Sequence, residues 1–138
     1  MSITKGSNGA NTEPSGSNYP ERSVVPESAI SDSRAQFVID FMNANLHRKI
    51  ALAELAEVAN LSPSHFSHLF KTQTGLSPGE YLRRLRMEKA RHLLVTSFLR
   101  VKEIMGMVGY NSKSHFVRHF RRSFDLAPSE YRRRISTS

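Results

Sequence analysis

Two stretches of the chain decide the fold: SHFSHLFKTQTGLSPGEYLRRL at residues 64–85 and SHFVRHFRRSFDLAPSEYRRRI at residues 114–135. Placed side by side at an offset of 50, they share ten identities in 22 positions. That is too many for two helices with only a hydrophobic periodicity in common, so the chain contains a duplicated unit. The duplication continues upstream at an offset of 49, where Leu55 corresponds to Ile104.

Each unit is predicted to be a short helix, a tight turn and a second helix. In the first unit Asn60 is placed to end the short helix, because asparagine tolerates the left-handed backbone that terminates helices. Ser62 and Pro63 then supply the N-cap and the first-turn proline of the second helix, and Gly75 ends it. The second unit has Gly109 at the corresponding turn. This arrangement is a helix-turn-helix.

A long helix is expected between the units, because residues 77–80 (Ser-Pro-Gly-Glu) form a capping box and an apolar stripe continues to about Ser97. Ser31 or Ser33 can cap an earlier helix that ends near Asn45. The predicted fold is therefore all-α, with about seven helices and two helix-turn-helix subdomains joined by a long central helix. The expected boundaries are 51–74 for the first helix-turn-helix, 77–97 for the linker helix, 101–124 for the second helix-turn-helix and 128–135 for the C-terminal helix.

The helical spacing also predicts which side chains face the core. Phe66 and Phe70, with their repeat partners Phe116 and Phe120, are four residues apart and are expected to be core rather than a platform for stacking bases. The other predicted core positions are Phe37, Val38, Phe41, Met42, Leu52, Leu55, Ala56, Val58 and Leu69.

Positive charge is concentrated in the part of the chain expected to fold. The 138 residues include 20 Lys+Arg and 12 Asp+Glu, a formal net charge of +8. The first 30 hold two basic and three acidic side chains, so residues 31–138 carry the other 18 and 9. Residues 1–30, rich in Ser, Gly, Asn and Pro, are predicted to be a disordered tail, and residues 31–138 the domain. A basic domain calls for a polyanion, either nucleic acid or an anionic membrane surface.

Several classes of function are excluded by what the sequence lacks. No cysteine is present, which rules out disulfides, thiolate nucleophiles and cysteine-ligated metals. The longest apolar run is far too short to span a membrane, and the N-terminus has no apolar signal core, so a cytoplasmic protein is expected. Scattered carboxylates and the lack of a paired nucleophile and base argue against an enzyme. His115 and His119 are one helical turn apart but lack a third ligand, so neither a metal nor a cofactor is predicted.

The outward faces of the second helix in each unit are rich in small hydroxyls and cations, the groups that reach base edges and phosphates. A merely solvated helix is the alternative for one such face, and the duplication favours DNA. A linker helix of about 20 residues is a rod about 30 Å long, close to the roughly 34 Å between successive major-groove segments. The outward positions are Ser64, Ser67, His68 and Lys71 in the first unit, and Lys113, Ser114, Val117, Arg118, Arg121 and Arg122 in the second.

The span 52–135 resembles the DNA-binding domain of the AraC/XylS family of bacterial transcription regulators. The resemblance rests on the motifs LAELA at 52–56, LSPSHFSHLFK at 61–71, TGLSP at 74–78, RLRMEKAR at 84–91, GY at 109–110 and PSEYR at 128–132, with SHF at 114–116. It implies two homeodomain-like helix-turn-helix units that bind asymmetric promoter sites, usually in activators that contact RNA polymerase. By position, the base-reading residues of the family fall on Ser64, Ser67, His68, Lys113, Ser114 and Arg118. The nearby cations Lys71, Arg121, Arg122 and Arg132 are candidates for phosphate contacts.

These observations predict a promoter-binding transcription regulator, an activator that works on double-stranded DNA as a monomer, with RNA polymerase as its protein partner and the nucleoid as its location. The alternative left open is a protein-binding modulator, such as an anti-activator, or an effector-less output module. Two departures from the family are expected to matter. Met105, with Gly106 beside it, replaces a small alanine and would shift that helix or make it less stable. Ala127 leaves the last helix less well capped than Ser77 caps the linker.

Overall fold

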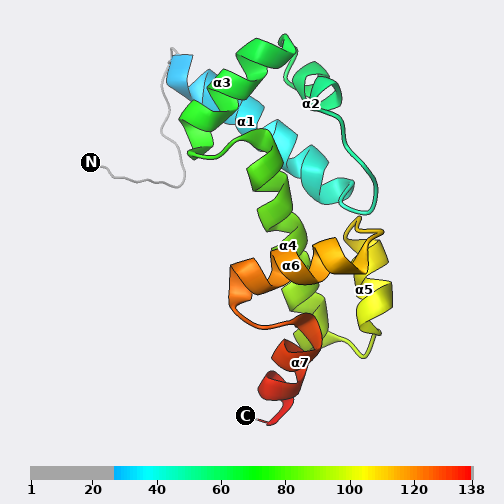
Figure 1. Ribbon diagram of the computed structural model, residues 1–138. Helices are drawn as coiled ribbons and strands as arrows, with labels where there is room; N and C mark the ends of the chain where they lie inside the picture. Colours follow the sequence, from blue (N-terminus) through cyan, green and yellow to red (C-terminus); the bar gives the residue numbers. More distant parts are fainter. Residues whose placement is uncertain (1–26, 138) are drawn as a thin grey trace, which may run out of the picture. The chain divides into compact units, whose positions relative to one another are not determined.

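The computed structural model describes the backbone of residues 27–137 and the side chains of residues 33–136. Within that part of the chain there are seven helices and no strand, which confirms the all-α prediction (Figure 1). None of these helices combines the length and the apolar character needed to cross a membrane. The helices are α1 (Glu27–Ala44), α2 (Leu52–Val58), α3 (Pro63–Thr74), α4 (Pro78–Thr96), α5 (Val101–Met107), α6 (Lys113–Phe124) and α7 (Pro128–Thr137).

The ends of the helices in the first unit follow the local signals in the sequence. Asn60 has a φ of 60°, and Gly75 ends α3 in the left-handed conformation with a φ of 82°. Ser62 caps α3, where its hydroxyl accepts a hydrogen bond from the N–H of His65. The capping box of α4 is complete, because Ser77 and Glu80 bond reciprocally. Four local predictions of structure are thereby confirmed.

The N-terminal helix is longer than predicted. It begins at Glu27, so Ser31 and Ser33 lie inside α1 rather than at its cap. No glycine or proline occurs between residues 27 and 44, so no residue of this stretch interrupts a helix. Residues 27–30 are therefore helical instead of tail, while the tail prediction for residues 1–26 lies outside the described residues.

Two separate cores fill the domain, and α4 contributes to both. The first contains Leu82 from the N-terminal half of α4, and the second contains Met87, Ala90 and Leu94 from its C-terminal half. Each helix-turn-helix unit thus has its own core on a shared helix. The remaining buried members are Val38, Met42, Leu46, Leu55, Ala56, Ala59, Phe66 and Phe70 in the first core and Ile104, Val108, Phe116 and Phe120 in the second.

Four predicted core residues lie outside these cores. Phe37 is 66% exposed, because its neighbour Val38 takes the core-facing position and successive helical residues point about 100° apart. Leu52 and Val58 are the first and last residues of α2, and each is about two-fifths exposed at 43% and 37%. Leu69, also predicted to be buried, is half-buried.

Met105 does not shift α5. The helix runs over Val101–Met107, which is the range of α2 displaced by 49 residues at both ends. Met105 is half-buried and packs against the second core. A flexible methionine can fill such a site at the edge of a core. The prediction that this helix is displaced is therefore wrong.

The two cores meet at a seam formed by Leu46, Arg48, Arg86 and Gly109. The Arg86 guanidinium on α4 donates a hydrogen bond from Nη2 to the backbone carbonyl of Arg48 over 2.6 Å. Gly109, in the turn after α5, has a φ of 84° and lies so close to this loop that a Cβ would overlap the carbonyl oxygen of Leu46. The seam joins the loop after α1 to the turn of the second unit.

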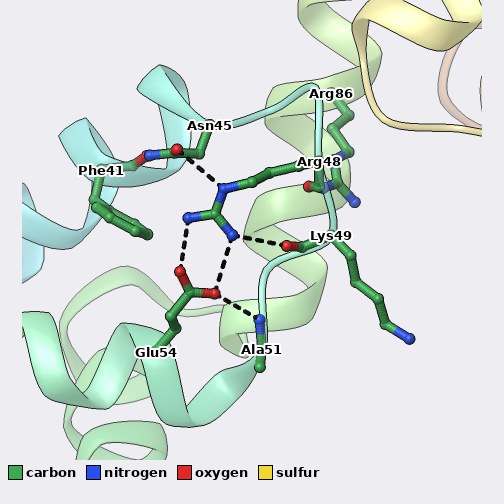
Figure 2. Close-up of polar contacts among 7 residues, drawn as sticks. All are labelled: Phe41, Asn45, Arg48, Lys49, Ala51, Glu54 and Arg86. Carbon is green, nitrogen blue, oxygen red and sulfur yellow. Dashed lines mark hydrogen bonds and ion pairs between the residues drawn. The ribbon is translucent and has the colours of Figure 1, made fainter.

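Figure 2 shows how the loop side of the seam is fixed. Arg48 donates from Nε to the side-chain oxygen of Asn45 over 3.2 Å, and from Nη1 and Nη2 to the carboxylate of Glu54 over 3.1 Å and 2.6 Å. Its guanidinium also lies 5.7 Å from the centre of the Phe41 ring. The hydrogen bond from Arg48 holds the pKa of Glu54 below its ordinary value. These contacts tie α1 and α2 to the loop that meets α4.

Candidate nucleic-acid interface

The predicted residues of the first unit lie together on one face of α3. Ser64, Ser67, His68 and Lys71 line a shallow groove on this face, and all are exposed except Ser67, which is half-buried. We call this surface the α3 face. Its other lining residues are Leu52, Pro63, Thr72, Ser77 and Pro78.

The predicted residues of the second unit lie together in the same way on α6. Lys113, Ser114 and Arg118 share one face with Arg121, Arg122 and the half-buried Val117. We call this surface the α6 face. It contains four cations and no carboxylate.

Both helices present their faces by the same device. On the opposite side of α3, Phe66 and Phe70 are buried in the first core with ring centres 5.4 Å apart. On α6, Phe116 and Phe120 are completely buried in the second core. At each N-terminus a serine hydroxyl, from Ser62 or Ser112, accepts the N–H three residues on over 3.3 Å. The aromatic anchors set the rotation of each helix, and the serine cap sets where it begins.

Arg132 lies outside both faces, so its assignment as a phosphate contact stays a prediction. Its guanidinium donates from Nε to the carbonyl of Leu94 over 3.0 Å and from Nη2 to the carbonyl of Ser97 over 3.3 Å. The last carbonyls of a helix lack partners within the helix, and a cation there also complements the helix dipole. Arg132 therefore ties α7 to the C-terminal end of α4.

The remaining predicted cation with a protein partner is Arg121. Its Nη2 lies 3.8 Å from the Glu130 carboxylate, and both side chains are about half-exposed or more, at 61% and 47%. An exposed ion pair at that distance contributes little to stability, so another anion can readily replace the Glu130 carboxylate as the partner of Arg121. Arg121 thus remains available to a phosphate.

The histidine pair on α6 has a structural setting. The rings of His115 and His119 are stacked with centres 6.4 Å apart, and the Tyr110 hydroxyl is hydrogen-bonded to Nδ1 of His119 over 2.6 Å. Burial raises the pKa of Tyr110. Partial burial, followed by the positive charges of Arg83 and Arg122, lowers the pKa of His119. Among the described residues, no group of three or more His, Asp or Glu side chains is placed to hold a metal ion.

Sequence reasoning missed one residue of these faces and left another, the outward Val117, without a role. Leu52 was expected in the core, yet it lines the α3 face and gives it an apolar edge. Val117 gives the α6 face a similar edge. Apolar side chains in a major groove contact the methyl group of thymine, so both residues add to what the faces could read. Sequence analysis predicted Val117 on the outward face, at the position that Ser67 fills in the first unit, but did not assign it to base reading.

Two helix-turn-helix units on a shared helix, each with an exposed polar or basic face on its second helix, define a DNA-binding domain. The sequence profile of a helix-turn-helix domain family matches residues 55–134, more than half of the chain. The chain belongs to the AraC/XylS family of transcription regulators and carries its helix-turn-helix DNA-binding domain.

Curated relatives are longer proteins. The lactose operon transcription activator of Staphylococcus xylosus is 37% identical over 75 residues, which cover 54% of this chain and 27% of that protein. The transcriptional activator Btr of Bacillus subtilis is 34% identical over 73 residues, covering 53% of this chain and 14% of Btr. The match thus spans about a quarter or less of the length of either relative.

Solved structures share the arrangement of helices. The DNA-binding domain of AdpA, a global transcriptional factor solved in complex with a target DNA, superposes with a TM-score of 0.68 and 31% identity, covering 72% of this chain and 89% of that one. The C-terminal domain of AraT, a response regulator from Geobacillus stearothermophilus, gives a TM-score of 0.66 at 30% identity, covering 75% of this chain and 84% of that one.

Proposed function

We propose that this protein is a sequence-specific regulator of transcription that places α3 and α6 in two successive major-groove segments of a promoter. The observation that carries the proposal is the repetition: two helices, held by the same serine caps and phenylalanine anchors, each expose a face of hydroxyls and cations. One such face would be an ordinary solvated surface, but two on one shared helix match the two grooves of one DNA face.

The roles proposed for individual side chains follow their chemistry. Ser64, Ser67 and His68 would read base edges from α3, and Lys113, Ser114 and Arg118 would read them from α6. Arg118 has no carboxylate on its face and can donate two parallel hydrogen bonds to guanine. The cations proposed for phosphates are Lys71, Arg121 and Arg122.

We propose that the chain binds DNA as a monomer, because both reading helices are already present in one chain. Many repressors need a dimer to place two such helices. A regulator that binds promoters works on the chromosome, so we place it in the cytoplasm, on the nucleoid.

We propose activation rather than repression, with RNA polymerase as the protein partner. The relatives from Staphylococcus xylosus and Bacillus subtilis are described as activators. An activator needs a second surface besides the one on DNA. Phe98, in the loop between α4 and α5, is fully exposed, Val95 nearby on α4 is 39% exposed, and neither lines a recognition face. A fully exposed phenylalanine favours a protein contact at this loop.

The proposal is tested by selecting duplexes from a random pool and measuring affinity for selected and scrambled DNA over a range of salt concentrations. We expect a preferred site and a steep loss of affinity with salt. Arg118→Ala should cost about 1 to 3 kcal/mol on the selected site and little on scrambled DNA. Binding that is weak, independent of salt and unaffected by Arg118→Ala would favour the alternative, a protein-binding modulator that uses the same fold.

A further inference from the structure

A hollow lined by cations lies between α4 and α6, and Arg122 is the only one of its lining residues that the sequence predicts to touch DNA. We call it the α4–α6 hollow. The charged or titratable residues that line it are Glu80, Arg83, Arg84 and Glu88 from α4, and His119 and Arg122 from α6. The domain therefore has a cationic surface in addition to the α3 face and the α6 face.

The two carboxylates of the hollow are committed to other partners. Glu80 accepts hydrogen bonds from the backbone N–H and the hydroxyl of Ser77, each over 3.1 Å, in the cap of α4. Glu88 accepts two hydrogen bonds from Arg91, at 3.1 Å and 3.0 Å. In contrast, Arg83, Arg84 and Arg122 form no ion pair anywhere in the part of the chain whose side chains are described.

His119 shows that these cations share one region of space. Besides partial burial, the charges of Arg83, Arg122, Arg118 and His115 all act on this ring and lower its pKa. They come from α4 and from both ends of α6, so the positive charges of two helices converge on this ring. An anion of two or more acceptor oxygens would relieve this repulsion and receive guanidinium hydrogen bonds.

The position of the hollow indicates which anion reaches it. Arg122 lines both the hollow and the α6 face. At the other end Leu76 lines the hollow, and the next residue, Ser77, lines the α3 face. The hollow thus joins the two faces, and DNA that enters both must pass its backbone between them.

We propose that the α4–α6 hollow binds a phosphate of the DNA backbone between the two groove segments, with Arg83 as its main ligand and Arg122 as the second. This inference rests on the proposed function and extends it, because it makes the linker helix a third contact with DNA. A guanidinium can form two parallel hydrogen bonds to one phosphate, and such contacts position the protein without reading sequence.

The first test compares Arg83→Gln with Lys89→Gln in the full chain. Both residues are exposed cations on α4, but Lys89 does not line the hollow. We expect Arg83→Gln to lower the slope of log K against log salt by about one on selected and scrambled DNA alike, with Lys89→Gln close to the parent. A melting temperature equal to that of the parent would establish that each variant is folded. Equal slopes for both variants would overturn the inference.

The second test locates the phosphate. A series of selected duplexes carries one neutral methylphosphonate at successive backbone positions between the two groove segments. We expect one position at which the parent loses affinity and Arg83→Gln loses none. Equal losses for parent and Arg83→Gln at every position would contradict the proposal.

A third measurement separates DNA from a free anion. Inorganic phosphate is titrated into the full chain without DNA while the His119 resonance is followed by NMR. No saturable shift is expected at millimolar phosphate. A saturable shift that Arg83→Gln abolishes would overturn the backbone proposal in favour of a free phosphate. Equal affinity of the parent for selected and scrambled DNA would instead overturn the proposed function. The salt slopes of Arg83→Gln and Lys89→Gln on scrambled DNA would still test whether the hollow binds a phosphate.

Discussion

Arg86 and Arg48 are 38 residues apart in the chain, and a hydrogen bond of 2.6 Å from the Arg86 guanidinium to the Arg48 carbonyl joins the two halves of the domain. Arg86 lies on α4 between Leu82, which belongs to the first core, and Met87, which belongs to the second. Its Nε is buried and has no hydrogen-bond partner among the described residues. A half-buried cation without a carboxylate partner adds little to stability, so we expect Arg86 to matter chiefly for the register of the two units.

Arg86→Met is expected to leave the fold intact and to weaken binding only where both units must engage DNA. Partial burial lowers the pKa of Arg86, because desolvation disfavours the charged guanidinium, and removing the charge relieves that cost. We expect stability within about 1 kcal/mol of the parent. Affinity should fall on duplexes that contain both groove segments and stay unchanged on duplexes that contain one. A similar loss on both kinds of duplex would mean that Arg86 has no role in register.

Gly109→Ala should destabilise the domain more than Gly75→Ala. Both glycines have positive φ, 84° and 82°, so each substitution carries a backbone penalty of about 1 to 2 kcal/mol. Only at Gly109 would the new Cβ overlap the Leu46 carbonyl and lie 3.1 Å from the Arg86 guanidinium, whereas the space at Gly75 is open. We expect urea unfolding to show an additional loss of about 2 kcal/mol or more at Gly109. Equal losses of unfolding free energy in the two variants would indicate that the seam adjusts to the added Cβ without cost.

Phe66→Ala and Phe116→Ala should each cost roughly 3 to 5 kcal/mol of unfolding free energy, because each removes a buried ring from its core. A domain of this size has little more stability than that to lose. Thermal melting monitored by circular dichroism checks this. A variant that kept the parent melting temperature but lost DNA binding would show that the ring contacts DNA instead.

The last helix should be easier to stabilise than the linker. Glu130 accepts the backbone N–H of Ala127 over 3.1 Å, but Ala127 has no hydroxyl to complete a capping box like that of Ser77 and Glu80. Ala127→Ser is expected to raise the unfolding free energy by about 1 kcal/mol, and Ser77→Ala to lower it by a similar amount. Urea denaturation measures both. A neutral Ala127→Ser would show that Arg132 already fixes the start of α7.

Stability should fall on mild acidification because of His119. Its pKa is lowered in the folded state, whereas in the unfolded chain it is near the usual value of about 6.5. Above that value both states are neutral. As the pH falls through it, the unfolded chain binds the proton first and is favoured, down to the folded-state pKa. In His119→Gln the decrease in unfolding free energy between pH 7.5 and 5 should be shallower than in the parent. Identical pH profiles would contradict this assignment.

Much of the fold could be predicted from the sequence because the residues that start and end its helices act locally. Asn60, Gly75 and the Ser77–Glu80 box each act on a backbone only a few residues away, and each works as predicted. The duplication then placed the second unit by comparison with the first. The outward positions on α3 and α6 follow from the same periodicity, which explains why the structure gathers them on two faces.

The parts that sequence reasoning missed depend on distant contacts. Arg132 was assigned to a phosphate from its position in the sequence, and only the fold shows that it reaches the carbonyl of Leu94, 38 residues earlier. The α4–α6 hollow requires Arg83 and Arg122 to converge from two helices whose packing no local pattern describes. Leu52 matched the core period, but its place at the first turn of a seven-residue helix leaves it at the edge.

The central claim is that one chain reads two successive groove segments, and the stoichiometry of the complex tests it most directly. Native mass spectrometry on a selected duplex, paired with a hydroxyl-radical footprint, gives both the number of chains and the bases they cover. We predict one chain per duplex and two protected segments about 34 Å apart on one side of an asymmetric site. Two chains on a palindromic site, each protecting a single segment, would contradict the account.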